Sequence, residues 1–289
     1  MLWQKKKKTR RTAKPKQKIT LPSQQPEEEI ANTVVPENIE EMLMKKIPAE
    51  KNSKMVSSPQ KEFLDIFRKL TDQYNSLDIW NDFIIMFACS LFNPFNKRFD
   101  RKLKKLYLQT VNKYKKQEQE LFRELASQTV LALEVNPEQD FLGSIFMSLN
   151  LGNENDGWTF RSYDICKEKA ESMVGDVLLK VERDGYISIN DSCCGTGALL
   201  IAGIHATKKH LDEADINYQN HIFVTAHDVS EVAALMCYIQ LSILGVAGYV
   251  KIDDPMMHPT TNIDDEKNYW FTPMYFSNIW VIRRILGRC

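Results

Sequence analysis

The sequence predicts an α/β fold in which a helical domain precedes an open parallel sheet. Two patterns support this prediction. From residue 59 to about 152, apolar residues recur mainly at helical spacing. Beyond residue 160, short strand-like runs alternate with helical stretches, and this alternation is typical of parallel strands joined by crossover helices. We therefore expect three parts, at residues 1–58, 59–152 and 153–289.

The first part, residues 1–58, predicts a disordered tail. It is rich in Lys, Pro, Gln and Glu and has few apolar residues that could stabilise a core. Residues 1–18 carry nine Lys or Arg and no acid, whereas the remainder of the chain carries 29 basic and 38 acidic residues. The basic segment has two open interpretations: an arm that binds nucleic-acid phosphates, or a solvated tail that aids solubility.

The second part, residues 59–152, predicts a helical domain. Ser58 and Pro59 are typical of a helix N-cap and first turn. The stretch Lys97–Lys116 has nine basic residues and one acid, with an apolar stripe on one side. Its basic side is either a solvated face or a surface that follows a nucleic-acid backbone. The further predicted helices are Asp78–Phe92, Gln119–Leu133 and Glu138–Leu149.

The third part, residues 153–289, predicts the sheet. A helix at Ile165–Leu179 comes first. The predicted strands are Tyr186–Asn190, His221–His227, Tyr249–Asp253 and the short run Asn268–Thr272. The helices between them are Ala198–His210 and Ser230–Leu244.

Cysteine usage and hydropathy indicate a cytoplasmic protein. The six cysteines form no C-x-x-C pair, which is typical of reduced thiols. The longest apolar run, Phe83–Phe92, is too short to span a bilayer, and no signal peptide is predicted. Cys193 and Cys194 with His205 and His210 lack the spacing of metal ligands, so we expect no metal.

The turn "DSCCGTG" after the first strand carries the functional signal. Gly195 and Gly197 allow a tight turn and a close approach of a ligand to the backbone. Asp191, at the strand end, can accept a hydrogen bond from an ammonium group. Asp228 follows the next strand, 37 residues on, where an acid can accept from both hydroxyls of a ribose. The chain has no G-x-G-x-x-G, and the turn has no lysine that could bind phosphates, so S-adenosylmethionine fits this pattern better than a dinucleotide.

At this point the chain resembles a known family. "DSCCGTGALLI" is similar to the D-P-x-C-G-[ST]-G signature of DNA adenine N-6 methyltransferases, in the branch of type I modification subunits and phage or mobile-element methylases. The stretches "QDFLGSIFMSLNLGN", "GWTFRSYDICKEKAE" and "AHDVSEVAALMCYIQLSILGV" are also similar to that branch. The resemblance implies an incomplete Rossmann-like methyltransferase sheet. It also implies that double-stranded DNA is a partner and that the protein takes part in restriction-modification.

The resemblance further implies a set of residues around the cofactor. Phe160 matches the family's aromatic in its F-T-P segment, although Arg161 and Ser162 stand where the family has Thr and Pro. Asp254, after the third strand, matches the acid that borders the adenine moiety. The implied cofactor-binding residues are Phe160, Asp191, Cys194, Gly195, Gly197, Asp228 and Asp254.

The family's second signature, [DNS]-P-P-[YFW], is degenerate here. In the family it accepts hydrogen bonds from the amino group of a flipped adenine and stacks on the base. The nearest matches are "DPMM", which lacks the aromatic, and "TPMY". In the second, the resemblance makes Thr272, Pro273 and Tyr275 the catalytic residues. The alternative interpretation is a strand end that packs its aromatic side chains.

Three functions therefore stay open. Only 14 residues follow Tyr275, whereas a complete methyltransferase sheet needs about three more strands. Either a specificity subunit or self-association completes the sheet, or the chain kept the cofactor half and lost the chemistry. The first function is a DNA adenine N-6 methyltransferase, acting alone or as one subunit of a modification complex. The second is a catalytically silent relative that binds the cofactor and acts by binding DNA or protein. The third is a methyltransferase-like enzyme with another substrate.

Overall fold

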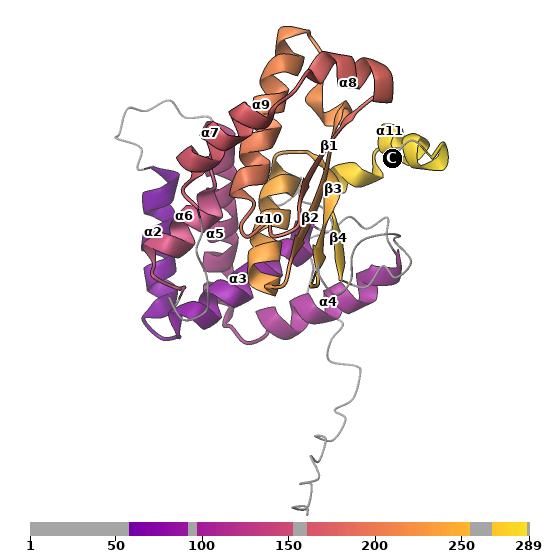
Figure 1. The fold of residues 1–289 in the computed structure, drawn as a ribbon. Helices are drawn as coiled ribbons and strands as arrows, with labels where there is room; N and C mark the ends of the chain where they lie inside the picture. Colours follow the sequence, from indigo (N-terminus) through magenta and orange to yellow (C-terminus); the bar gives the residue numbers. More distant parts are fainter. Residues whose placement is uncertain (1–57, 92–96, 153–160, 255–267, 288–289) are drawn as a thin grey trace, which may run out of the picture. The chain divides into compact units, whose positions relative to one another are not determined.

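The computed structural model describes residues 58–91, 97–152, 161–254 and 268–287 (Figure 1). All of these described residues belong to the same compact unit. The predicted disordered tail lies outside the described residues, with Ser58 as the exception.

Helices make up the first part of the described chain, as the apolar spacing predicts. Ser58 caps the first helix, because its side chain accepts a hydrogen bond from the Lys61 N–H (3.3 Å) and Pro59 follows in the first turn. The apolar side of this helix is buried. The helices of this part are α2 (Pro59–Thr71), α3 (Ser76–Leu91), α4 (Lys97–Val111), α5 (Lys116–Val135) and α6 (Phe141–Ser148).

A sheet in the order β1-β2-β3-β4 makes up the second part, which confirms the mixed α/β class. Strands β1, β2 and β3 are parallel, as predicted. We call the edge at which these three strands end the carboxyl-end edge, and the edge at which they begin the amino-end edge. The strands are β1 (Ile187–Asp191), β2 (Ile222–Asp228), β3 (Ala247–Ile252) and β4 (Tyr269–Phe271).

The fourth strand departs from the predicted parallel sheet. β4 runs antiparallel to β3, with Phe271 opposite Tyr249 and Tyr269 opposite Lys251. An antiparallel strand ends where its parallel neighbours begin. The residues that follow β4 therefore lie at the amino-end edge, whereas a parallel fourth strand would have brought them to the carboxyl-end edge.

The single helix predicted at Ile165–Leu179 is wrong, because the chain forms two helices there. They are α7 (Tyr163–Met173) and α8 (Val177–Asp184). Between them, the carboxylate of Asp176 accepts a hydrogen bond from the Leu179 N–H (2.9 Å) and caps α8. In the sequence, Gly175 is a signal for a helix break and Asp176 is a signal for an N-cap. The prediction of one helix followed the apolar spacing and disregarded these two signals.

Helix α10 (Glu231–Ile243) connects the two parts of the described chain. It packs on β2 and β3, and its opposite side contacts α3. Residues 233–241 are all buried, since they have neighbours on every side. Helix α9 (Ala198–Glu213) packs on β1 and contacts α7 and α8 (Figure 1).

Aromatic side chains cover the other face of the sheet, near its amino-end edge. Phe223 of β2 and Phe271 of β4 pack there with Tyr275 of the 3₁₀ helix η4 (Pro273–Phe276). Helix α11 (Asn278–Ile285) adds Trp280, whose indole N–H donates to the carbonyl of Gln219 (2.8 Å). The short 3₁₀ helix that contains Gln219 is η3 (Tyr218–Asn220).

Candidate cofactor site

The glycine turn lies at the carboxyl-end edge, between β1 and α9. Gly195 has φ 54° and Gly197 has φ 96°, both in the left-handed region that favours glycine. A Cβ atom at Gly197 would lie 2.9 Å from the Sγ of Cys237 on α10. The turn is therefore packed directly against α10, and a side chain at Gly197 would push them apart.

Two carboxylates flank this turn, as the sequence predicts. Asp191 ends β1, and its Oδ1 accepts from the Cys193 N–H (3.0 Å). Asp228 ends β2, and its Oδ2 accepts from the Gly195 N–H (2.8 Å), while its Oδ1 accepts from the Ser230 N–H (2.9 Å). Both are half-buried. A carboxylate oxygen has two lone pairs, so both side chains are oriented by the backbone and still able to accept from a ligand.

The third strand brings more acid to the same edge. The Asp253 N–H donates to the carbonyl of Asp228 (3.1 Å), and the Asp254 N–H donates to Asp253 Oδ1 (2.8 Å). Lys251 Nζ is 3.6 Å from Asp253 Oδ2 and balances part of that charge. The carboxyl-end edge thus gathers four Asp residues, from the ends of β1, β2 and β3.

Cys194 has a packing role within the turn. Its N–H donates to the carbonyl of His227 (2.8 Å) and ties the turn to β2. A hydrogen bond with the Cys237 thiol, together with burial, raises the pKa of the Cys194 thiol. The thiol is therefore neutral at physiological pH and belongs to the contact with α10. Its main-chain atoms are the part that belongs to the candidate site.

A buried polar network that was not predicted from the sequence lies behind the turn. The Thr196 hydroxyl donates to Asp140 Oδ2, and Gln240 Nε2 donates to Asp140 Oδ1 (2.8 Å) and to the Thr196 carbonyl (2.9 Å). Asp140 also caps α6 by accepting from the Gly143 N–H (3.0 Å). Burial raises the pKa of Asp140, and its three hydrogen bonds oppose that shift. The network joins α6, the turn and α10, and so holds the turn in place.

The stretch that resembles the family's F-T-P segment lies only partly within the described residues. Phe160 lies outside the described residues, so its predicted contact with a cofactor stays a prediction. The residues that follow form α7, in which Cys166 and Ala170 pack against Ala198 and Ala202 of α9. The start of α7 therefore borders the helix that begins at the glycine turn.

The predicted catalytic residues do not join the glycine turn. The Thr272 hydroxyl is buried, donates to the Val246 carbonyl (2.7 Å) and accepts from the Gly248 N–H (3.1 Å). These partners precede or begin β3, whereas Asp254 follows its end. Six residues of extended strand span about 20 Å. Thr272 and its neighbours Pro273 and Tyr275 therefore lie at the amino-end edge, because β4 is antiparallel.

Tyr275 packs as the alternative interpretation expects. It is 8% exposed, and its ring lies 4.5 Å, centroid to centroid, from that of Phe271 and 6.1 Å from that of Phe223. The guanidinium of Arg284 covers the ring at 3.6 Å. Its faces therefore contact side chains of this chain, where stacking on a base would require one face to be open.

Comparisons of the chain with protein-family models, curated proteins and solved structures gave no significant match. Within the described ranges, no group of three His, Cys, Asp or Glu side chains has the arrangement of a metal site. None of the helices described here is long and apolar enough to cross a membrane.

Proposed function

We propose that this chain binds S-adenosylmethionine at the carboxyl-end edge of its sheet, as a relative of the adenine methyltransferases that its motifs resemble. The observation that carries the proposal is the glycine turn between two oriented carboxylates. Gly195 and Gly197 keep the turn free of side chains. Asp191 offers acceptors to the ammonium group of the methionine part, and Asp228 offers them to the ribose hydroxyls.

The charge at this edge supports S-adenosylmethionine over a dinucleotide. Asp191, Asp228, Asp253 and Asp254 surround the strand ends, with Lys251 as a partial counter-charge. Such an edge repels the phosphates of NAD and attracts a ligand that carries an ammonium and a sulfonium group. The turn itself contains neither lysine nor arginine.

The position of Thr272–Tyr275 supports the second of the three functions, a cofactor-binding relative without adenine transfer through this motif. A DNA adenine methyltransferase subunit is the second candidate, and one observation favours it. β1 is one of the two outer strands of the described sheet, with β2 as its neighbour on one side only. A specificity subunit or a second copy of the chain that adds strands to β1 would extend the sheet beside the candidate cofactor site.

Calorimetric titration of the full chain with S-adenosylmethionine and, separately, with NAD tests the proposal. We expect binding of the first and no binding of the second. Absence of binding to S-adenosylmethionine overturns the proposed function.

A transfer assay with tritiated methyl groups and genomic DNA separates the two candidates. We expect no transfer above background from the isolated chain. Transfer by the isolated chain would favour the methyltransferase and require an acceptor pocket other than Thr272–Tyr275.

A further inference from the structure

Helix α4 has two sides of opposite character. Its inner side is buried, with Leu103 at 8% and Val111 at 5% exposure, and it packs on α3. The outer side presents a row of exposed cations. We call this row the α4 basic face, and it consists of Arg101, Lys102, Lys104 and Lys105.

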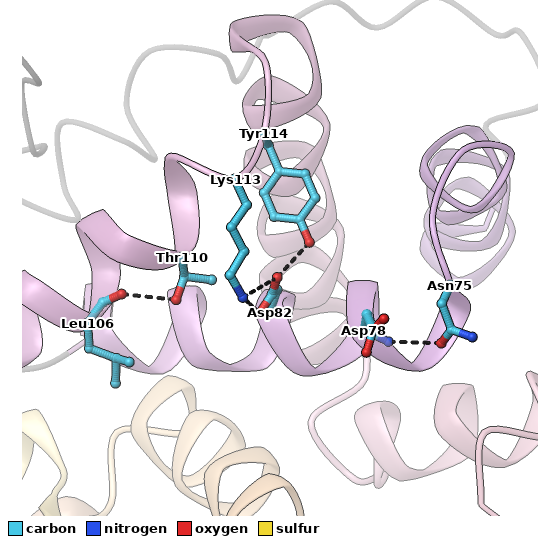
Figure 2. A network of polar contacts seen from close by, with 7 residues as sticks. All are labelled: Asn75, Asp78, Asp82, Leu106, Thr110, Lys113 and Tyr114. Atoms are coloured by element: carbon cyan, nitrogen blue, oxygen red, sulfur yellow. Dashed lines mark hydrogen bonds and ion pairs between the residues drawn. The ribbon is translucent and has the colours of Figure 1, made fainter. Parts of the chain in front are cut away.

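The orientation of α4 is set where the helix ends (Figure 2). Asp82 of α3 is buried and accepts from Lys113 Nζ (2.8 Å) and from the Tyr114 hydroxyl (2.6 Å). Burial, followed by this hydrogen bond, raises the pKa of Tyr114, so it stays a neutral donor. The contacts among these three side chains fix the end of α4 to α3. They thereby keep the apolar side of α4 buried against α3 and the basic face exposed to solvent. Lys113 is neutralised by Asp82 and is not part of that face.

The four cations of the α4 basic face have no ion-pair partner among the side chains that the structure describes. The one acid of this helix, Asp100, precedes the face, and its side chain is not among those described. The stretch from residue 101 to 116 contains no Asp or Glu. Arg101 and Lys105 are also one turn apart, and like charges at that spacing destabilise a helix. An external polyanion would relieve this repulsion.

We propose that the α4 basic face binds the phosphate backbone of a double-stranded nucleic acid. Four cations lie within a helical rise of about 6 Å. A duplex carries one phosphate charge per roughly 1.7 Å of its axis when both strands are counted, so the density of charge on the two partners is of the same order. The exposed amide of Gln109, two turns after Lys102 on the same helix, adds a neutral donor for phosphate oxygens, and the exposed amide of Asn112 follows just after the helix ends.

The structure argues against a membrane as the partner of this face. A helix that lies on a bilayer buries its apolar side among the lipid chains. In α4 that side is already buried against α3, and Leu103 and Val111 are not available. Because phosphate contacts carry no base information, the binding is independent of sequence. It requires no S-adenosylmethionine and goes beyond the proposed cofactor function.

Fluorescence anisotropy of the full chain with a short DNA duplex and a short RNA duplex tests this proposal. Titrations run from about 50 to 200 mM salt, without cofactor. The variant Lys104→Gln/Lys105→Gln removes two cations. We expect the slope of log K against log salt to become shallower by about 1.8, since each lost phosphate contact contributes about 0.9. The arm with the larger change identifies the nucleic acid.

The matched control is Lys169→Gln/Lys180→Gln, which removes two exposed cations from α7 and α8. It should leave the slope unchanged. All variants keep the nine cations of residues 1–18, so a difference between them reports on α4. An unchanged slope in the α4 variant, or an equal change in the control, overturns the proposal. The proposal is also overturned if the α4 variant loses binding to anionic vesicles while its duplex binding stays equal to that of the wild type. Equal melting temperatures and S-adenosylmethionine affinities in both variants separate this result from a failure of the proposed function.

Discussion

The two edges of the sheet differ in how many hydrogen-bonding groups of their side chains are still available to a ligand. At the carboxyl-end edge, Asp191 and Asp228 are half-buried and held by backbone N–H groups, with lone pairs still open. At the amino-end edge, the Thr272 hydroxyl is buried with both a donor and an acceptor partner, and Tyr275 lies in an aromatic cluster. The first edge therefore has acceptors available for the ligand that we propose, whereas the side chains of the second are packed and paired within the chain.

This difference shows how far a short motif can be trusted. The segment "TPMY" keeps a hydroxyl oxygen, one proline and the aromatic of the adenine-pocket signature. In the structure the direction of β4 decides what they do, because it determines the edge at which they emerge. The glycine turn, in contrast, is positioned by the local succession of strand, turn and helix.

The largest effect should come from Tyr275→Ala. Removing a buried aromatic ring from a packed cluster costs about 3–5 kcal/mol of unfolding free energy. Chemical denaturation should show this loss, while the S-adenosylmethionine affinity of the folded fraction stays at the wild-type value. A stable Tyr275→Ala protein with lost cofactor binding would contradict the assignment of the amino-end edge to packing.

Asp228→Ala should weaken S-adenosylmethionine binding by about 10- to 100-fold. A hydrogen bond to a charged group contributes roughly 1.5–3 kcal/mol, and this variant removes the proposed acceptor for the ribose. Calorimetry measures the change. Asp212→Ala, at an exposed position near the end of α9, is the matched control and should bind normally. Equal affinities for the two variants would remove Asp228 from the site.

Thr196→Val should lower stability by about 1–3 kcal/mol, because Asp140 Oδ2 loses its donor in a buried place. Since Thr196 belongs to the turn, we also expect several-fold weaker cofactor binding. Thr196→Ser keeps the hydroxyl and should restore both values. If Thr196→Val lowers stability and leaves affinity intact, the network supports the fold without positioning the turn.

The smallest expected effect is on the stability of the protein at low pH. Burial, and then Lys251, lower the pKa of His227, which lies beside the turn. Because the folded pKa is below the unfolded value, the unfolded state takes up more protons below about pH 6.5. His227 therefore contributes stability above that pH, which is lost as the pH falls through its folded pKa. Thermal melts of His227→Gln should show a shallower loss of stability between about pH 7 and 5 than the wild type. Identical profiles would contradict this.

The sequence was sufficient where the signal is local. The strands β1–β3, the N-cap at Ser58 and the turn with Gly195 and Gly197 follow from nearby residue types. The direction of β4 was not predictable in this way, because its three residues are all buried aromatics and carry no signal of strand direction. The Asp140 network joins residues 56 and 100 positions apart, which no local pattern connects. One signal was present: Gln240 is a lone amide within the apolar part of α10, and a buried amide needs partners.

Hydrogen–deuterium exchange of the full chain, with and without saturating S-adenosylmethionine, tests the central claim most directly. It asks which edge of the sheet the ligand protects. We expect slower exchange in peptides that cover residues 191–197 and 228–233. Peptides that cover 246–249 and 272–276 should exchange at the same rate in both states. Protection of residues 272–276 with none at residues 191–197 would contradict the account, as would exchange that the ligand does not change anywhere.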